Sequence, residues 1–184
     1  MTVPVAVSVS VLYSLTEDRL AMVAIAADGT QQVLMVTRRL AVRLVNGFAH
    51  LLERTSAAAA EAPERARGDM VMFEHQGALS SISPPASSAE SASPRGGAVP
   101  PAAAAVARAT AKAVLMHAVD VTVTPERFVL TLKSEAGPVA SMEVTRGDLH
   151  RLLALVRRKC DEAEWRVPIQ TRWLDLKSGS MTLN

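Results

Sequence analysis

The chain has 184 residues, of which 49 % are apolar, and its 20 basic and 18 acidic side chains leave a net charge of +2. Such a chain can bury a packed core in one domain or two small ones, and its nearly balanced charge excludes a strong polyanion-binding field over the whole surface. A single cysteine, Cys160, excludes an internal disulfide framework and indicates a reducing, cytoplasmic location. No stretch approaches the roughly 20 apolar residues that cross a bilayer, so we expect no membrane segment.

The first apolar run, residues 3–15, has the length of a signal-peptide core. It lacks a basic leader, and residues 7–11 alternate with the period of a strand, so we interpret it as a strand. Polar turns are predicted at 16–19 and 27–30, and two further strands at 20–26 and 32–37 complete a meander. The strand over 20–26 is apolar on both faces, which predicts that something beyond its own helix covers one of them.

After Thr37 the apolar period changes from two to about 3.6, which predicts an amphipathic helix. The apolar positions of this helix are Ala41, Leu44, Val45, Phe48 and Leu52. The following residues, 57–66, are rich in alanine and glutamate and are predicted to extend the helix. Residues 69–79 carry enough apolar surface for a short strand or a turn of helix. From 80 to 101 the composition is that of a flexible linker, and 102–112 is expected to form a marginal helix.

The same pattern then recurs 108 positions later, without a gap. The identical pairs are Thr16 and Thr124, Arg19 and Arg127, Gly29 and Gly137, Val36 and Val144, Thr37 and Thr145, Arg38 and Arg146, Arg43 and Arg151, and Leu44 and Leu152. Strands are predicted at 114–123, 128–133 and 140–145. The second helix carries its apolar face at Leu149, Leu152, Leu153, Val156, Cys160 and Ala163. Thr145 with Asp148 predicts an N-cap, and Gly29 and Gly137 predict turns with positive φ.

The fold class is therefore predicted to be α+β, with an internal duplication of a β-β-β-α unit. We expect the two units to form a pseudo-dimer, either within one chain or by exchange between chains, and the pattern leaves both arrangements open. The predicted division is 1–56 for the first unit, 57–79 for a partly ordered connector, 80–112 for a disordered linker with a short helix, 113–164 for the second unit, and 165–184 for a C-terminal strand or strap.

The C-terminal segment contains both tryptophans, Trp165 and Trp173. We interpret it as an additional strand or strap that closes the core. The alternative is that the tryptophans dock onto a partner chain, and the first unit has no matching tail.

No pattern of catalytic residues is present. The four histidines have no spacing that would place two metal ligands on one helix face, and Cys160 lies on an apolar stripe where a thiol acts as a small hydrophobe. Phosphate loops, nucleophile elbows and dinucleotide fingerprints are missing from the sequence. We therefore expect no cofactor, no metal and no enzymatic activity.

The repeated arginines are the candidate interaction residues. Arg38 with Arg146, and Arg43 with Arg151, would form a symmetric set if the units pair. Our preferred interpretation is that these arginines have structural roles, since arginine can bind turn carbonyls or lie over a sheet edge. The alternative is a basic groove that binds phosphates.

In element order, the two meanders that each end in a helix resemble the PUR-repeat and Whirly families, which bind single-stranded nucleic acid. Those families use a fourth strand per unit and exposed aromatic side chains, whereas the strands here offer Tyr13, Phe128 and few others. The resemblance implies a nucleic-acid-binding alternative that uses the arginine groove. Our first expectation is a non-catalytic scaffold or protein-interaction module that forms a homodimer. High alanine and arginine usage indicates a bacterial source.

Overall fold

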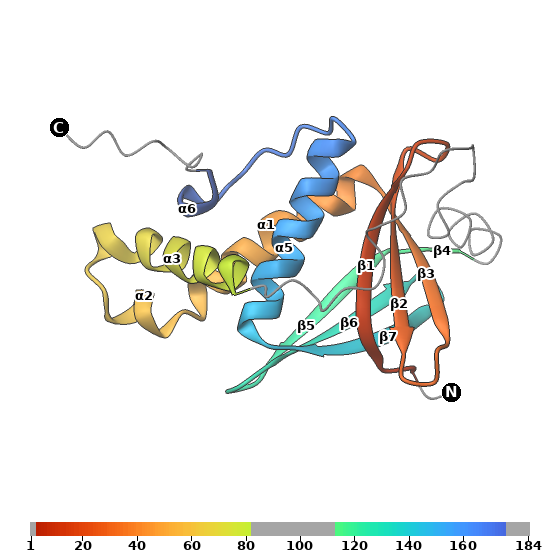
Figure 1. The fold of residues 1–184 in the computed structure, drawn as a ribbon, viewed down its shortest axis with the longest axis horizontal. Helices are drawn as coiled ribbons and strands as arrows, with labels where there is room; N and C mark the ends of the chain where they lie inside the picture. Colours follow the sequence, from red (N-terminus) through yellow and green to blue (C-terminus); the bar gives the residue numbers. More distant parts are fainter. Residues whose placement is uncertain (1–2, 82–112, 176–184) are drawn as a thin grey trace, which may run out of the picture.

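The computed structural model describes residues 3–81 and 113–175, and this part of the chain is a mixed α+β fold of two β-sheets and five α-helices. The flexible linker was predicted to begin at residue 80, but Ser80 is the last residue of a helix; the rest of that prediction, over 82–101, and the predicted helix over 102–112 lie outside the described residues. Figure 1 shows the sheets at one end, the long helices α1 (Arg38–Arg54) and α5 (Arg146–Glu162) beside them, and shorter helices beyond.

The first sheet combines an antiparallel meander with a short strand from much later in the chain. Its strands are β1 (Ala6–Ser14), β2 (Arg19–Ala26), β3 (Gln31–Val36) and β4 (Val114–Leu115). They lie in the order β1-β2-β3-β4, with β4 parallel to β3. Gly29 has a φ of 82°, as its turn position predicted, and Asp18 has a φ of 46°, a conformation that aspartate tolerates.

The second sheet is an antiparallel meander. Its strands are β5 (Ala118–Val123), β6 (Phe128–Ser134) and β7 (Gly137–Val144), in the order β5-β6-β7. The turn between β5 and β6 is closed by Thr124, whose N–H donates to the Arg127 carbonyl at 2.9 Å. Gly137 has a φ of 120°, which again confirms the predicted glycine turn.

The prediction of one continuous strand over 114–123 was wrong. The chain leaves the first sheet at Met116, whose N–H donates to the Met35 carbonyl at 2.9 Å, and enters the second sheet at His117, whose N–H donates to the Lys133 carbonyl at 2.8 Å. The alternating apolar pattern continues through the crossing, from Val114 to Met116 and on into β5. A periodic pattern reports a strand's faces and carries no information about its neighbours.

The two sheets are joined at two matching places. One is the parallel pairing of β3 with β4. The other is a parallel bridge between Val5 and Ser141, where the Ser141 N–H donates to the Pro4 carbonyl at 2.9 Å. In each case the chain that leads into the first strand of one half pairs with the third strand of the other half. The halves are therefore interlocked through their backbones.

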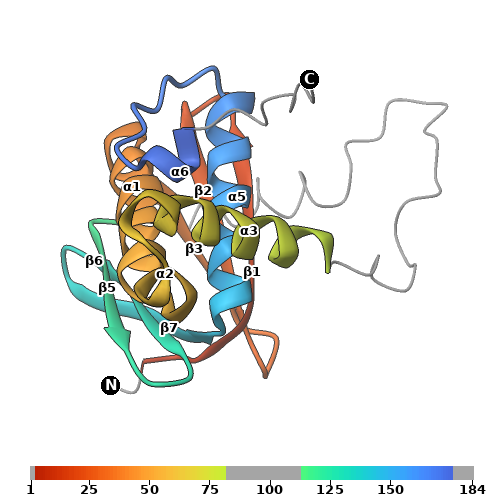
Figure 2. The same cartoon turned by 90° about the vertical axis from the view of Figure 1, so that its left-hand side faces the viewer.

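Helices α1 and α5 pack against each other and cover the inner faces of both sheets (Figures 1 and 2). Both begin after a threonine N-cap. In α1 the Leu40 N–H donates to Thr37 Oγ1 at 3.2 Å. In α5, Thr145 and Asp148 form a full capping box, which confirms the predicted N-cap.

The segment after α1 forms two further helices, α2 (Ala57–Glu61) and α3 (Arg67–Ser80), with a 3-10 turn η1 (Glu64–Ala66) between them. The prediction that 57–66 extends the first helix was wrong. Ser56 is the reason, because its side chain accepts from the Ala59 N–H at 3.0 Å and starts a separate helix. Of the two predictions for 69–79, helix is correct.

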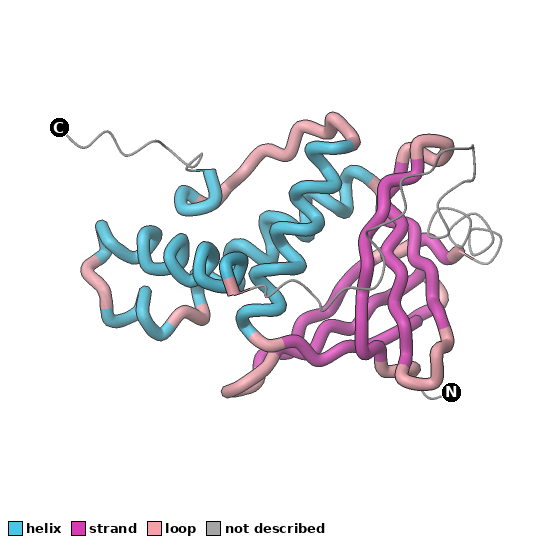
Figure 3. Tube along the Cα trace, in the orientation of Figure 1, coloured by secondary structure: helices cyan, strands magenta, loops and turns pink. Residues whose placement is uncertain are grey.

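The C-terminal segment forms no strand within its described part, as Figure 3 shows. It leaves the end of α5 as an extended segment, passes the middle of α1, and finishes in the short helix α6 (Arg172–Asp175). Asn46 on α1 holds it in place. Its amide nitrogen donates to the carbonyls of Val42 and Pro168 at 3.0 Å, and its oxygen accepts from the Gln170 N–H at 2.8 Å.

Replacing Asn46 with alanine is expected to release this segment and to lower the free energy of unfolding by about 2 kcal/mol, because the variant removes the part-buried hydrogen bonds to Pro168 and Gln170. Hydrogen exchange should show loss of protection at the Gln170 amide. His50→Ala, an exposed change on the same helix, is the control. Unchanged exchange at Gln170 in the Asn46 variant would contradict the assignment.

Both faces of β2 are buried, as its composition predicted. Leu20 and Met22 belong to the main core, whereas Ala21 and Val23 form a second apolar cluster with Val33 and Met35 on the opposite face of the sheet. A charged residue at Met22 would therefore disrupt folding itself, because Met22 faces the core.

Candidate functional site

Arg38 and Arg146, which correspond under the 108-residue repeat, lie in two different environments, and Arg146 binds protein atoms. Its guanidinium donates to Glu74 Oε2 from Nε at 2.9 Å and from Nη2 at 2.6 Å. It also donates to Thr55 Oγ1 at 2.8 Å and to the Leu52 carbonyl at 2.5 Å. Leu52 lies at the C-terminal end of α1, where carbonyls lack helical partners and favour a cation. Arg146 thus joins α5, α3 and the end of α1.

Two further arginines of α5 bind the ends of neighbouring helices. Arg151 donates from Nε to the Ala78 carbonyl at 3.0 Å and from Nη1 to Asp148 Oδ1 at 2.8 Å. Arg157 donates to the Leu174 carbonyl at 2.8 Å. These contacts fix α3 and α6 on α5.

The other two sequence-predicted arginines, Arg38 and Arg43, are exposed on α1. Arg43 and Arg151 line different grooves, which have no residue in common. The structure therefore does not gather the four arginines into one basic groove.

A histidine pair lies in the interface between α3, α5 and α6. His75 Nδ1 and His150 Nδ1 are 3.2 Å apart, and both rings meet the indole of Trp173, with centroids at 5.5 and 6.1 Å. His150 is only 1 % exposed. Among the described residues, His150 Nε2 and Trp173 Nε1 have no hydrogen-bond partner. The pairing links residues 75 positions apart, and nothing in their spacing indicated it.

Burial keeps both imidazoles neutral. Desolvation, followed by the electrostatic effects of the neighbouring His75 and Arg146, lowers the pKa of His150 to about 4 against the opposing effect of Glu74. Desolvation, followed by the charge of Arg157, also lowers the pKa of His75. Neither histidine lines the two grooves or the hollow described below.

Both sequence-predicted tryptophans are buried within the protein's own fold. The Trp165 indole N–H donates to Asp18 Oδ1 at 3.0 Å, and its ring meets Tyr13 edge to face at 6.0 Å. The Tyr13 hydroxyl donates to the same carboxylate oxygen at 2.8 Å. Trp165 thereby ties the end of α5 to the first hairpin.

Within the residues that the structure describes, no group of three or more histidine, cysteine, aspartate or glutamate side chains is arranged to hold a metal ion. Cys160 is buried, and burial raises the pKa of its thiol to about 11. The thiol is therefore protonated at neutral pH and is a poor nucleophile.

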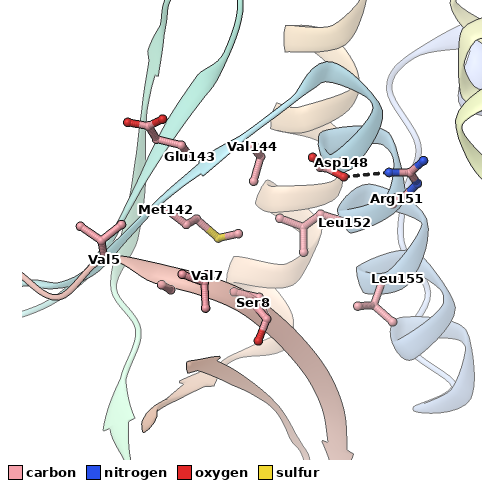
Figure 4. Close-up of a pocket in the computed structure, with 12 residues that line it drawn as sticks. Val5, Val7, Ser8, Met142, Glu143, Val144, Asp148, Arg151, Leu152 and Leu155 are labelled. Carbon is pink, nitrogen blue, oxygen red and sulfur yellow. Dashed lines mark hydrogen bonds and ion pairs between the residues drawn. The ribbon is translucent and has the colours of Figure 1, made fainter. Parts of the chain in front are cut away.

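A first groove, the α5–β1 groove, opens where the edges of β1 and β7 separate above the Val5–Ser141 bridge (Figure 4). It has a volume of about 720 Å³. Val7, Met142, Leu152 and Leu155 supply apolar lining, and Figure 4 shows the Asp148–Arg151 ion pair at one side. Val7 is 67 % exposed.

A second groove, the α1–β5 groove, lies between α1 and the edge strand β5 and has a volume of about 370 Å³. Apolar side chains on its lining are Leu40, Leu44, Leu51, Val119 and Val121. Basic side chains on its lining are Arg43, His50, Arg54 and His117. A hollow of about 300 Å³ shares Leu40, Arg43 and His117 with it and adds Arg39 and Leu115.

Gly47 keeps the middle of the α1–β5 groove open. A Cβ at this position would meet no atom within 4 Å, so the missing side chain leaves free space on a helix. The position 108 residues later is Leu155, which lines the α5–β1 groove.

Over the described ranges, 3–81 and 113–175, no helix combines the length and apolar character that spanning a membrane requires. The comparisons with known proteins assign no family to the chain. No protein-family model matches the chain, and no curated protein or solved structure does so either.

Proposed function

We propose that this protein is a non-catalytic interaction module that binds segments of other proteins in grooves beside its two long helices. The pair of grooves carries the proposal. Each lies between a long helix and a strand, and Arg43 with Leu44 in one corresponds to Arg151 with Leu152 in the other. Exposed apolar grooves of this size mark binding sites for other molecules. In contrast, Arg146 and His150 hold the helices together.

The proposal includes an internal duplication whose two units pair within one chain. The packing of α1 on α5 and the two matching strand junctions support this arrangement. Exchange of units between chains would instead give a homodimer. Sedimentation equilibrium distinguishes the two, since a mass of 19.6 kDa corresponds to a closed monomer.

Peptide selection tests the proposed function. The full-length protein, immobilised, is exposed to a phage library of random peptides, and the enriched peptides are remeasured by fluorescence anisotropy. We expect binders whose affinity falls at least tenfold in the double variant Val7→Asp/Gly47→Leu, which alters both grooves. Leu15→Asp is the matched control, because Leu15 is 83 % exposed and lines neither groove.

Two results would overturn the proposal. One is a selection that yields no peptide sensitive to the groove variant. The other is tight binding of a labelled single-stranded oligonucleotide that weakens by orders of magnitude between about 50 and 200 mM salt. The second result would support the nucleic-acid alternative, and Arg38→Glu would then test the exposed arginines of α1.

A further inference from the structure

We propose that the α1–β5 groove binds an extended, acidic, apolar-rich segment of a partner protein, which adds as a strand to the free edge of β5. This inference rests on the proposed function and assigns the chemistry of one of its grooves. Three observations support it: the charge of the groove, the edge of β5, and the length of the space.

The ionisable side chains that line the groove are all basic. Arg43 and Arg54 line it together with two histidines, and no carboxylate does. Glu53 lies near the rim, with its Oε2 3.9 Å from His50 Nδ1. Two unopposed guanidinium groups beside an apolar floor complement a segment that carries both carboxylates and apolar side chains.

The edge of β5 is open to pairing. In the described part of the chain, β5 pairs with β6 alone. Natural edge strands are commonly protected by lysine, proline or a bulge. The sequence of β5, AVDVTV, has no lysine or proline, and its single charge, Asp120, is bound to Lys133 Nζ at 2.9 Å. Val123, at the end of this edge, is 49 % exposed.

The space matches a strand in length. With the adjoining hollow, the lining runs from Thr37 to Arg54 along α1, which is about 25 Å at 1.5 Å per residue. A strand covers that distance with about seven or eight residues. Strand addition supplies backbone hydrogen bonds for affinity, while the groove selects the side chains.

The test uses a fluorescein-labelled peptide of about eight residues that alternates valine with aspartate or glutamate. Anisotropy with the full-length protein should show binding that weakens with salt. Two control peptides should bind at least tenfold more weakly. One carries lysine in place of every acid, and the other has proline at its centre, which removes a strand hydrogen bond.

Three protein variants locate the site. Arg43→Glu should weaken binding about tenfold through lost attraction and new repulsion. Arg38→Glu, the same change one turn earlier outside both spaces, should change affinity less than twofold. Gly47→Leu should abolish binding by filling the groove and should also raise Tm, because leucine is a better helix former than glycine.

Each contrary outcome has a distinct meaning. Equal affinity for the acidic and lysine peptides, or for the acidic and proline peptides, overturns the inference. The inference is also overturned if the acidic peptide still binds the Gly47→Leu variant but does not bind the Val7→Asp variant, because the peptide would then lie in the α5–β1 groove. If the acidic peptide does not bind, but random selection still yields peptides that are sensitive to the groove variant, this inference alone is refuted. Failure of both refutes the proposed function as well.

Discussion

Replacing Arg146 with alanine is expected to lower the free energy of unfolding by about 2 to 3 kcal/mol. The variant removes four hydrogen bonds and leaves the carboxylate of Glu74, which also accepts from Ser56 Oγ at 2.7 Å, without its arginine partner. Breaking a fully buried ion pair costs about 3 to 5 kcal/mol. The side chains of Arg146 and Glu74 are 27 % and 25 % exposed, so water screens the pair and reduces the loss.

Urea unfolding followed by tryptophan fluorescence measures this loss, since Trp165 and Trp173 are both buried. The matched control is Arg158→Ala, an exposed change on the same helix, which should cost less than about 0.5 kcal/mol. A double-mutant cycle with Glu74→Gln should give a coupling energy above about 1 kcal/mol. Equal losses in the Arg146 and Arg158 variants would show that the network adds nothing to stability.

Acidification is expected to destabilise the protein by up to about 3 kcal/mol between pH 6.5 and pH 4. The pKa of His150 falls from 6.5 to about 4 on folding, mainly because the ring is buried. The unfolded chain therefore binds a proton in this range that the folded chain rejects, and stability declines as the pH drops below 6.5. One pKa unit corresponds to about 1.4 kcal/mol, and the lowered pKa of His75 acts in the same direction.

Urea midpoints measured from about pH 7 to about pH 4 test this expectation. His150→Phe should flatten the pH dependence, whereas His117→Phe, at an exposed histidine, should leave it unchanged. Asp28 and Asp148 also have a lowered pKa, but each carboxyl starts from 3.8, so its contribution is lost only at more acidic pH. An unchanged slope in the His150 variant would mean that other groups control the acid response.

The local elements of the fold were predictable because their signals are local. Alternating residues gave the strands, and the change of period after Thr37 and Thr145 marked the starts of α1 and α5. The positive φ of Gly29 and Gly137 followed from turn positions that recur 108 residues apart. Each of these features depends on a few neighbouring residues.

The connections between elements were not predictable from the same signals. The crossing at Met116 and His117 depends on which edges are free in the folded sheets. The separate helix α2 after Ser56 could not be predicted, because the run of alanines that follows favours a longer first helix and only the capping side chain of Ser56 opposes it.

The candidate site shows the same division. The repeat pointed to Arg38 with Arg146 and Arg43 with Arg151 as a set, but Arg146 binds Glu74 of α3, whereas its counterpart Arg38 is exposed on α1. The groove around Gly47 could not be predicted from the sequence, because a glycine in a helix indicates only a low helix propensity. Its basic rim combines residues from α1 and from the chain entering β5, which only the fold brings together.

The interlocking of the halves makes the rate of protein synthesis relevant to the final structure. The chain that forms β1 to β3 and α1 is complete at Arg54, but the helix that covers the apolar face of α1 is complete only at Glu162, 108 residues later. At about 5 to 20 residues per second, that face waits roughly 5 to 20 s for its partner. Translation speed between residues 55 and 162 would therefore determine how long this apolar face stays uncovered on the nascent chain.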